Sequence, residues 1–199
     1  MVVPGRIEVI AGGMFAGKTG ELILRLTRAE LARQTTAAFK HALDVRYTPD
    51  NLATHVPPRP RGNSTEHPAV PVSTPGAILS RLDRSRLPSV VGIDEAQFFD
   101  STLPDVCQQL SAWGVRVIIA GLDMDSEGAP FGSMGTMLAI ADEVTKVHAV
   151  CMQCGADATH TLYCGGDKQG QVLVGAQEYS ARCRACWHAA RHLALTALL

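Results

Sequence analysis

The sequence predicts an α/β fold: a mostly parallel sheet with helices on both faces, joined to a small zinc-binding subdomain. Three observations support this prediction. An apolar run at residues 7–11 passes through a glycine-rich loop into a segment with helical spacing. Two later apolar runs, 90–93 and 115–120, each end in acidic residues, and two C-x-x-C pairs lie near the C-terminus. Buried parallel strands alternating with helices give the first two patterns.

The glycine-rich loop has the pattern G-x-x-x-x-G-K-[ST]. It consists of Gly12, Gly13, Met14, Phe15, Ala16, Gly17, Lys18 and Thr19. The glycines let backbone N–H groups turn toward a phosphate, and the N-terminus of the following helix adds a partial positive charge. Lys18 supplies a charge for the outer phosphates, and the Thr19 hydroxyl can bind Mg²⁺. The pattern predicts a P-loop NTPase-like (RecA-like) domain that binds a nucleoside triphosphate.

Composition excludes several other classes. The chain has 199 residues, which favours one domain with a small appendage, and 46% of them are hydrophobic, enough for a buried core. The formal net charge of −1 argues against binding to nucleic acid through bulk positive charge. No run of 18 apolar residues could span a bilayer, and residues 1–5 lack the features of a signal peptide. We expect a cytoplasmic protein with no membrane or nucleic-acid partner, whose six cysteines form no disulfides.

The first half of the chain is expected to alternate helices and strands. Helical spacing extends over residues 22–33, a second strand is predicted at 36–39, and a polar loop follows at 41–47. Residues 48–76 are rich in proline and lack periodicity, so we expect a flexible surface loop. This loop is either one that moves with substrate or a mobile insertion without function. A short helix is predicted at 77–82.

The two later strands bring carboxylates to one edge of the sheet. Strand 90–93 leads into an acidic box that consists of Asp94, Glu95, Ala96 and Gln97. After a helix predicted at 103–113, strand 115–120 leads into a second acidic segment at 121–125. Carboxyl ends of parallel strands meet at the same edge, so both segments should face the phosphate loop. Asp94 then has the Walker B role as a partner of Mg²⁺.

Glu95 is available for proton transfer if Asp94 serves the metal. It could deprotonate a water, which gives an ATPase, or take the proton of a substrate hydroxyl, which gives a kinase. A salt bridge without catalytic role is the structural alternative. The acidic box also resembles that of RNA helicases, but a helicase closes ATP between two RecA-like domains. A chain of 199 residues with one phosphate loop is too short for that.

Four cysteines have the spacing of a metal site: Cys151, Cys154, Cys183 and Cys186. Each C-x-x-C pair can bind one side of a tetrahedral Zn²⁺, and four thiolates complete a closed structural site. A redox-active C-x-x-C is disfavoured because there are two pairs and neither is expected to open a helix, as thioredoxin's does. Cys107 is expected to be buried on a helix and Cys164 to be exposed. The segment between the pairs should protrude as a flexible lid, with an extended part at 171–175.

Together these motifs resemble a known family. The chain is similar to cytosolic-type (type II) thymidine kinases over residues 7–188. The resemblance rests on the phosphate loop, both cysteine pairs, and residues 44–47, 93–99, 121–123, 130–131 and 174–179. The predicted organisation is a nucleotide-binding domain at 1–148, a zinc-binding subdomain with a lasso loop at 149–188, and a C-terminal tail at 189–199, where an amphipathic helix is expected.

The resemblance implies transfer of the γ-phosphate of ATP to the 5′-hydroxyl of thymidine, in salvage for DNA synthesis. Glu95 would be the general base, residues 12–19 and 94–97 would bind ATP, and Thr19 with Asp94 would hold Mg²⁺. The thymidine site would comprise Met14, Asp44, Arg46, Phe98, Leu122, Phe131, Thr161, Gln171, Val172, Leu173, Val174, Gly175 and Tyr179. The resemblance also implies ATP, Mg²⁺ and one structural Zn²⁺ as cofactors, a homotetramer, and inhibition by the end-product triphosphate.

The sequence departs from the family pattern at four places. Ser126 stands where a base-stacking phenylalanine is usual, Tyr163 where arginine is common, and Gly20 where a hydroxyl residue is usual. The segment before Tyr179 is one residue short. Loss of a base-stacking ring is worth ~1–3 kcal/mol, so we expect phosphoryl transfer to be retained and base selectivity to be weaker. Two alternatives stay open: a kinase of another nucleoside such as deoxyuridine, and a non-catalytic nucleotide-binding zinc protein.

Overall fold

A six-stranded, fully parallel sheet forms the centre of the molecule. The computed structural model describes residues 5–44, 51–53, 66–165 and 178–196. The strand order is β5-β2-β6-β7-β1-β8. Their bounds are Val70–Val72, Thr36–His41, Val90–Asp94, Arg116–Gly121, Arg6–Ala11 and Glu143–Lys146. Because β7 lies between β1 and β6, the phosphate loop after β1 and the acidic box after β6 face the same edge, one strand apart.

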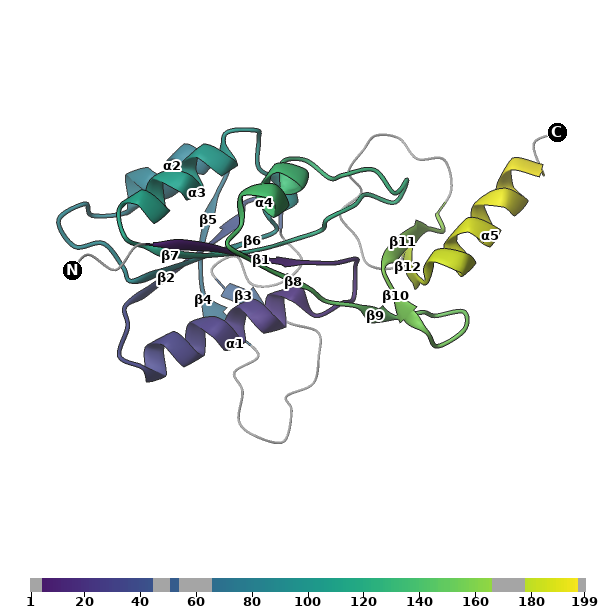
Figure 1. Ribbon diagram of the computed structural model, residues 1–199, viewed down its shortest axis with the longest axis horizontal. Helices are drawn as coiled ribbons and strands as arrows, with labels where there is room; N and C mark the ends of the chain where they lie inside the picture. The colour runs from purple at the N-terminus through teal and green to yellow at the C-terminus, as the bar shows by residue number, and fades with distance from the viewer. Residues whose placement is uncertain (1–4, 45–50, 54–65, 166–177, 197–199) are drawn as a thin grey trace.

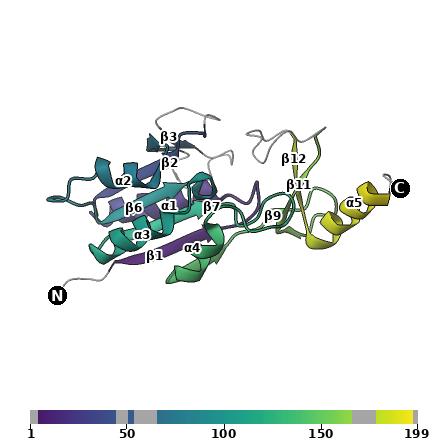
Figure 2. The same ribbon diagram turned by 90° about the horizontal axis from the view of Figure 1, so that it is seen from above.

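Helices cover both faces of this sheet, as the sequence predicts (Figures 1 and 2). Helix α1, Lys18–Leu31, lies on one face. Helices α2, Pro75–Arg81, α3, Leu103–Ala112, and α4, Met134–Ile140, lie on the other. Alternate side chains of each strand enter the two cores: Val9 and Ile119 pack with α3 and α4, whereas Ile10 and Ile118 pack with α1. Burying each of these side chains contributes ~1.5–3 kcal/mol.

Most predicted elements are present, with shifted ends. The first helix stops at Leu31, short of the predicted residue 33, because Arg33 adopts a left-handed φ of 62°. Strand β2 continues to His41, so the polar loop begins later than predicted. Helix α2 begins at Pro75, which suits a first helical turn because proline needs no N–H partner there.

The prediction of a flexible loop at 48–76 is wrong for residues 51–53 and 66–76. Strand β3, Asn51–Ala53, pairs with β4, Glu66–Pro68, and β5 is a strand of the central sheet. These strands have three residues each, too few to give a periodic pattern. Pro71 is tolerated in β5 because this strand is at the sheet edge. The rest of the predicted loop, 48–50 and 54–65, lies outside the described residues.

A smaller unit follows the sheet. It contains two antiparallel pairs and helix α5, Arg184–Thr196. The strands are β9, Ala149–Val150, with β10, Asp157–Ala158, and β11, His160–Tyr163, with β12, Tyr179–Arg182. The predicted boundary between residues 188 and 189 falls inside α5, and the lasso segment 171–175 lies outside the described residues. None of the helices in the described part of the chain is long and apolar enough to cross a membrane.

Candidate active site

The phosphate loop connects the end of β1 to the start of α1. Gly17 is the residue before the helix and has a left-handed φ of 81°, which glycine adopts without strain. A side chain at Gly12 would collide with the carbonyl oxygen of Val147. Lys18 folds back over the loop and donates to the carbonyl oxygen of Gly13 at 2.8 Å. The loop therefore joins a strand to a helix N-terminus, as its sequence pattern predicts, and its contact with a phosphate stays a prediction.

Thr19 and Asp94 meet across the sheet edge. The Thr19 hydroxyl donates to Asp94 Oδ2 at 2.9 Å. Burial, reinforced by repulsion from Glu95, raises the pKa of Asp94 to about 7. A bound cation would favour the charged form, and hydroxyl and carboxylate oxygens are ligands that Mg²⁺ prefers. The pair predicted to hold Mg²⁺ fits that ion.

Glu95 occupies a constrained backbone position directly after β6. It adopts a left-handed φ of 53°, rare for a residue with a side chain, and is followed by a short 3₁₀ helix, η1, Ala96–Phe98. The carboxylate Oε2 accepts a 2.6 Å hydrogen bond from Gln97 Nε2. Backbone outliers of this kind concentrate at functional sites, where the surrounding structure holds them in place.

Aromatic rings gather around the acidic box. Phe98 and Phe131, both predicted to line the thymidine pocket, pack edge to face with centroids 5.9 Å apart. His41 packs edge-on against Phe99 at 4.7 Å, and burial lowers the pKa of His41 below its usual range. A neutral imidazole therefore adds no positive charge beside the acidic box. The sequence analysis did not single out His41.

Lys40 is a second residue that the sequence analysis missed. Its side chain is 1% exposed, and its Nζ donates to the carbonyl oxygen of Asn51 at 3.1 Å and lies 4.0 Å from Asp44 Oδ2. Lys40 thus holds the predicted substrate residue Asp44 near the end of β2. The available signal was weak, because Lys40 directly follows the predicted strand 36–39 and stands next to a histidine.

The smaller unit contacts the phosphate loop directly. The backbone N–H of Met14 donates to Thr161 Oγ1 on β11 at 3.0 Å. Ala16 packs against the small core formed by Ala149, Ala158 and Ala181. Thr161 was expected near the thymine methyl, and its role toward the base stays a prediction.

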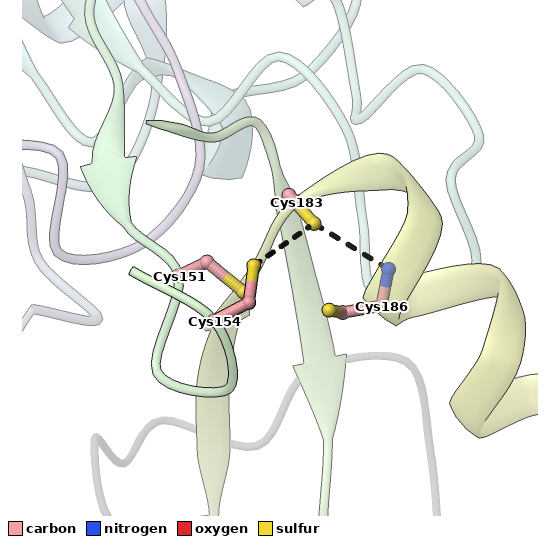
Figure 3. Close-up of side chains that lie close together, drawn as sticks. All are labelled: Cys151, Cys154, Cys183 and Cys186. Carbon is pink, nitrogen blue, oxygen red and sulfur yellow. Dashed lines mark hydrogen bonds between the residues drawn. The ribbon is translucent and has the colours of Figure 1, made fainter. Parts of the chain in front are cut away.

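The four cysteine sulfurs converge in this unit (Figure 3). Their Sγ atoms all lie within 4.8 Å of one another, and Cys154 and Cys183 are 3.7 Å apart. A tetrahedral zinc with ~2.3 Å bonds needs sulfurs about 3.8 Å apart, so the cluster fits Zn²⁺. One expectation was wrong: Cys183 directly precedes α5, so the second pair does open a helix. The convergence of all four sulfurs, rather than the absence of a helix, distinguishes the site from a redox pair.

Comparisons with known proteins identify the family of the chain. The family model described as thymidine kinase matches residues 5–187. A thymidine kinase of Bacteroides fragilis is 50% identical over 192 residues, covering 94% of this chain and 88% of the relative. Thymidine kinases of Porphyromonas gingivalis and Rhodothermus are 48% and 45% identical, covering 92% and 98% of this chain and 85% and 86% of theirs.

The chain belongs to the thymidine kinase family. Several thymidine-site residues expected from the resemblance cannot be placed: Arg46 and 171–175 lie outside the described residues. Tyr179 is on β12, where its ring packs against Tyr163 at 5.4 Å. The Tyr163 hydroxyl lies 3.4 Å from Glu178, so this departure from the family pattern interacts within its own hairpin.

Ser126, the main departure of this thymidine kinase family member, is buried beneath α5. Trp187 Nε1 donates to the carbonyl oxygen of Ser126 at 3.3 Å, and its ring would contact any side chain at Gly128. Arg191 stacks on the Trp187 ring at 4.6 Å and pairs with Glu127. Trp187 was not predicted as a site residue. It directly follows Cys186 of the four-cysteine cluster, which was the available signal.

Proposed function

We propose that this enzyme transfers the γ-phosphate of ATP to the 5′-hydroxyl of thymidine. One observation carries the proposal: the phosphate loop, the Thr19–Asp94 pair and the carboxylate of Glu95 converge at one edge of the sheet. The Phe98–Phe131 ring pair lies beside this edge and suits the binding of a planar base. The ribose hydroxyl of the bound nucleoside would then be directed at Glu95. The relatives named thymidine kinase support the same acceptor.

In the proposed reaction the 5′-oxygen of the nucleoside attacks the γ-phosphorus. A P–O bond forms as the bond to the β,γ-bridging oxygen breaks, ADP leaves, and the hydroxyl proton passes to Glu95. Lys18 stabilises charge on the outer phosphates. Mg²⁺, held by Thr19 and Asp94, would neutralise phosphate charge, and a structural Zn²⁺ would hold the smaller unit together. Thymidine monophosphate and ADP are the products.

The direct test is ADP release in a coupled assay with ATP and Mg²⁺, with and without thymidine. Thymidine-dependent release of ADP, matched by one monophosphate formed per ADP, is the expected result. Release of ADP without any nucleoside would instead indicate an ATPase. Nucleotide binding without turnover would indicate a non-catalytic zinc protein.

Because Ser126 is buried under α5, deoxyuridine should be tested as a second acceptor beside thymidine. Because no aromatic ring stands at position 126, discrimination between thymidine and deoxyuridine should be weak. Ratios of kcat/KM for the two nucleosides, measured in the same assay, test this. From the family resemblance we also propose a homotetramer and a cytoplasmic location. Light scattering of the zinc-loaded enzyme tests the homotetramer.

A further inference from the structure

The side chain of Gln97 connects the predicted base to a neighbouring strand end. Its Nε2 donates to Glu95 Oε2 at 2.6 Å, and its Oε1 accepts from the backbone N–H of Leu122 at 2.9 Å. Gln97 is 2% exposed. One carboxamide thus spans from the end of β6 to the residue directly after β7. The sequence analysis had placed Gln97 among the ATP contacts.

The partners of Gln97 fix which way its amide points. The N–H of Leu122 can only donate, so it requires the carbonyl Oε1 of Gln97. The amide Nε2 must then face Glu95, where it can only donate to the carboxylate. The backbone N–H of Leu122, directly after β7, therefore determines the direction of both hydrogen bonds of Gln97.

Two glycines close the space around this residue. A Cβ at Gly121 would lie 3.0 Å from Gln97 Oε1, and one at Gly132 would overlap the carbonyl oxygen of Gln97. Gly132 also has a left-handed φ of 52°. Gly121 packs on the Gln97 carboxamide and Gly132 packs on its backbone carbonyl, so close packing holds both the side chain and the backbone of Gln97, and the direction set by Leu122 is passed to Glu95.

We propose that Gln97 is a positioning residue that orients the Glu95 carboxylate and couples it to the wall of the nucleoside pocket. This inference rests on the proposed function. The same amide fixes the base at one end and Leu122, a predicted pocket residue, at the other. Gln97 therefore sets the distance between the proton acceptor and the bound nucleoside. Misplacing a reacting group by about 1 Å can cost ~10²-fold in rate.

Two substitutions separate this role from simple packing. Gln97→Leu removes both hydrogen bonds, whereas Gln97→Glu keeps an acceptor for Leu122 and loses the donor to Glu95. We expect kcat to fall ~10²-fold in both, with KM for ATP within about twofold of the parent. Gln109→Leu, an exposed glutamine on α3, is the matched control and should keep full activity. If Gln97→Leu fails to fold, Gln97→Glu still removes the hydrogen bond donated to Glu95 and tests the positioning role.

A double-mutant cycle with Glu95→Ala decides whether Gln97 acts through the base. Without that carboxylate, Gln97→Glu should change the residual kcat less than about threefold, because coupled residues are not additive. Additive losses, or parallel falls in kcat, ATP affinity and melting temperature, would overturn the inference. Absence of nucleoside-dependent turnover in the parent enzyme would instead refute the proposed function. Parent turnover with unaffected Gln97 variants would refute only the positioning role.

Discussion

At the scale of single residues, two buried carboxylates have opposite surroundings. Asp94 lies beside Glu95, so burial and repulsion raise its pKa to about 7. Glu8 on β1 is 1% exposed in its side chain and accepts hydrogen bonds from Arg116 and Arg25, with Arg6 also in contact. These contacts outweigh the cost of burial and lower the pKa of Glu8 below 4.5. Asp94 is therefore suited to ligand binding, whereas Glu8 stabilises the position of β1.

Glu95→Gln should keep ATP binding and slow phosphoryl transfer ~10²–10⁴-fold, because the amide cannot accept the hydroxyl proton. Rapid-quench single-turnover rates and a fluorescent-nucleotide titration measure the two effects separately. The control is Gln108→Leu, an exposed residue of α3. An unchanged single-turnover rate would remove Glu95 from its role as base.

Glu8 should contribute stability at neutral pH that disappears in acid. Its pKa is lower in the folded than in the unfolded chain, so the contribution is complete above about 4.5 and is lost as pH falls through the lower folded value. We expect Glu8→Gln to reduce the free energy of unfolding by ~1–3 kcal/mol at pH 7. Urea unfolding from pH 7 to pH 3 should show this difference shrinking below about pH 4.5. A difference independent of pH would contradict the assignment.

At the scale of elements, α5 anchors the loop at residues 122–131 that leads from β7 to Phe131. Trp187 donates to Ser126, Arg191 pairs with Glu127, and the loop closes through a bridge between Met124 and Pro130. Because Phe131 ends this loop and packs on Phe98, the position of α5 affects where these two rings lie. The first turn of α5 also carries Cys186, so the four-cysteine cluster and this loop contact one helix.

Trp187→Ala should therefore destabilise the fold by ~3–5 kcal/mol, the usual cost of truncating a buried tryptophan, and raise KM for thymidine more than KM for ATP. Thermal unfolding and steady-state kinetics measure the two effects. Trp113→Ala is the matched control, because Trp113 follows α3 and contacts Arg84 instead of the loop. It should lower stability and leave both KM values unchanged. Equal changes in both variants would refute a specific link to the pocket.

At the scale of the whole molecule, the smaller unit supports the phosphate loop from outside the sheet. Thr161 Oγ1 accepts a hydrogen bond from the backbone N–H of Met14, and Ala16 packs into the small core of this unit. The loop is thus held between α1 on one side and β11 on the other. We therefore expect a change at the four sulfurs to alter the affinity for the triphosphate.

Removal of zinc should lower both thermal stability and ATP affinity. Structural zinc supplies ~10–16 kcal/mol of apparent binding free energy in small peptides, far more than a core of four small side chains can replace. Metal analysis, melting temperature and ATP titration before and after chelation measure this. Cys164→Ser should keep the metal, since Cys164 lies outside the cluster, whereas Cys151→Ser should lose it. Full ATP affinity after loss of zinc would contradict the supporting role.

The elements and motifs with strong local patterns could be predicted from the sequence. The apolar run that ends in Asp94 predicted a strand, and the G-x-x-x-x-G-K-[ST] pattern predicted the phosphate loop. The cysteine spacing predicted the cluster of four cysteines. Strand β5 could not be predicted, because three residues containing Pro71 carry no period. The orientation of Gln97 could not be predicted either, since it depends on Leu122, 25 positions away in the chain.

The sequence by itself determined the main alternation of strands and helices, the positions of the phosphate loop and acidic box, and the four cysteines that cluster. These depend on residues near one another in the chain, where spacing is sufficient information. Only the tertiary structure decided that Gln97 holds Glu95, that Trp187 covers Ser126 and that Thr161 meets Met14. Each of these contacts depends on close packing and side-chain direction, which a one-dimensional pattern does not encode.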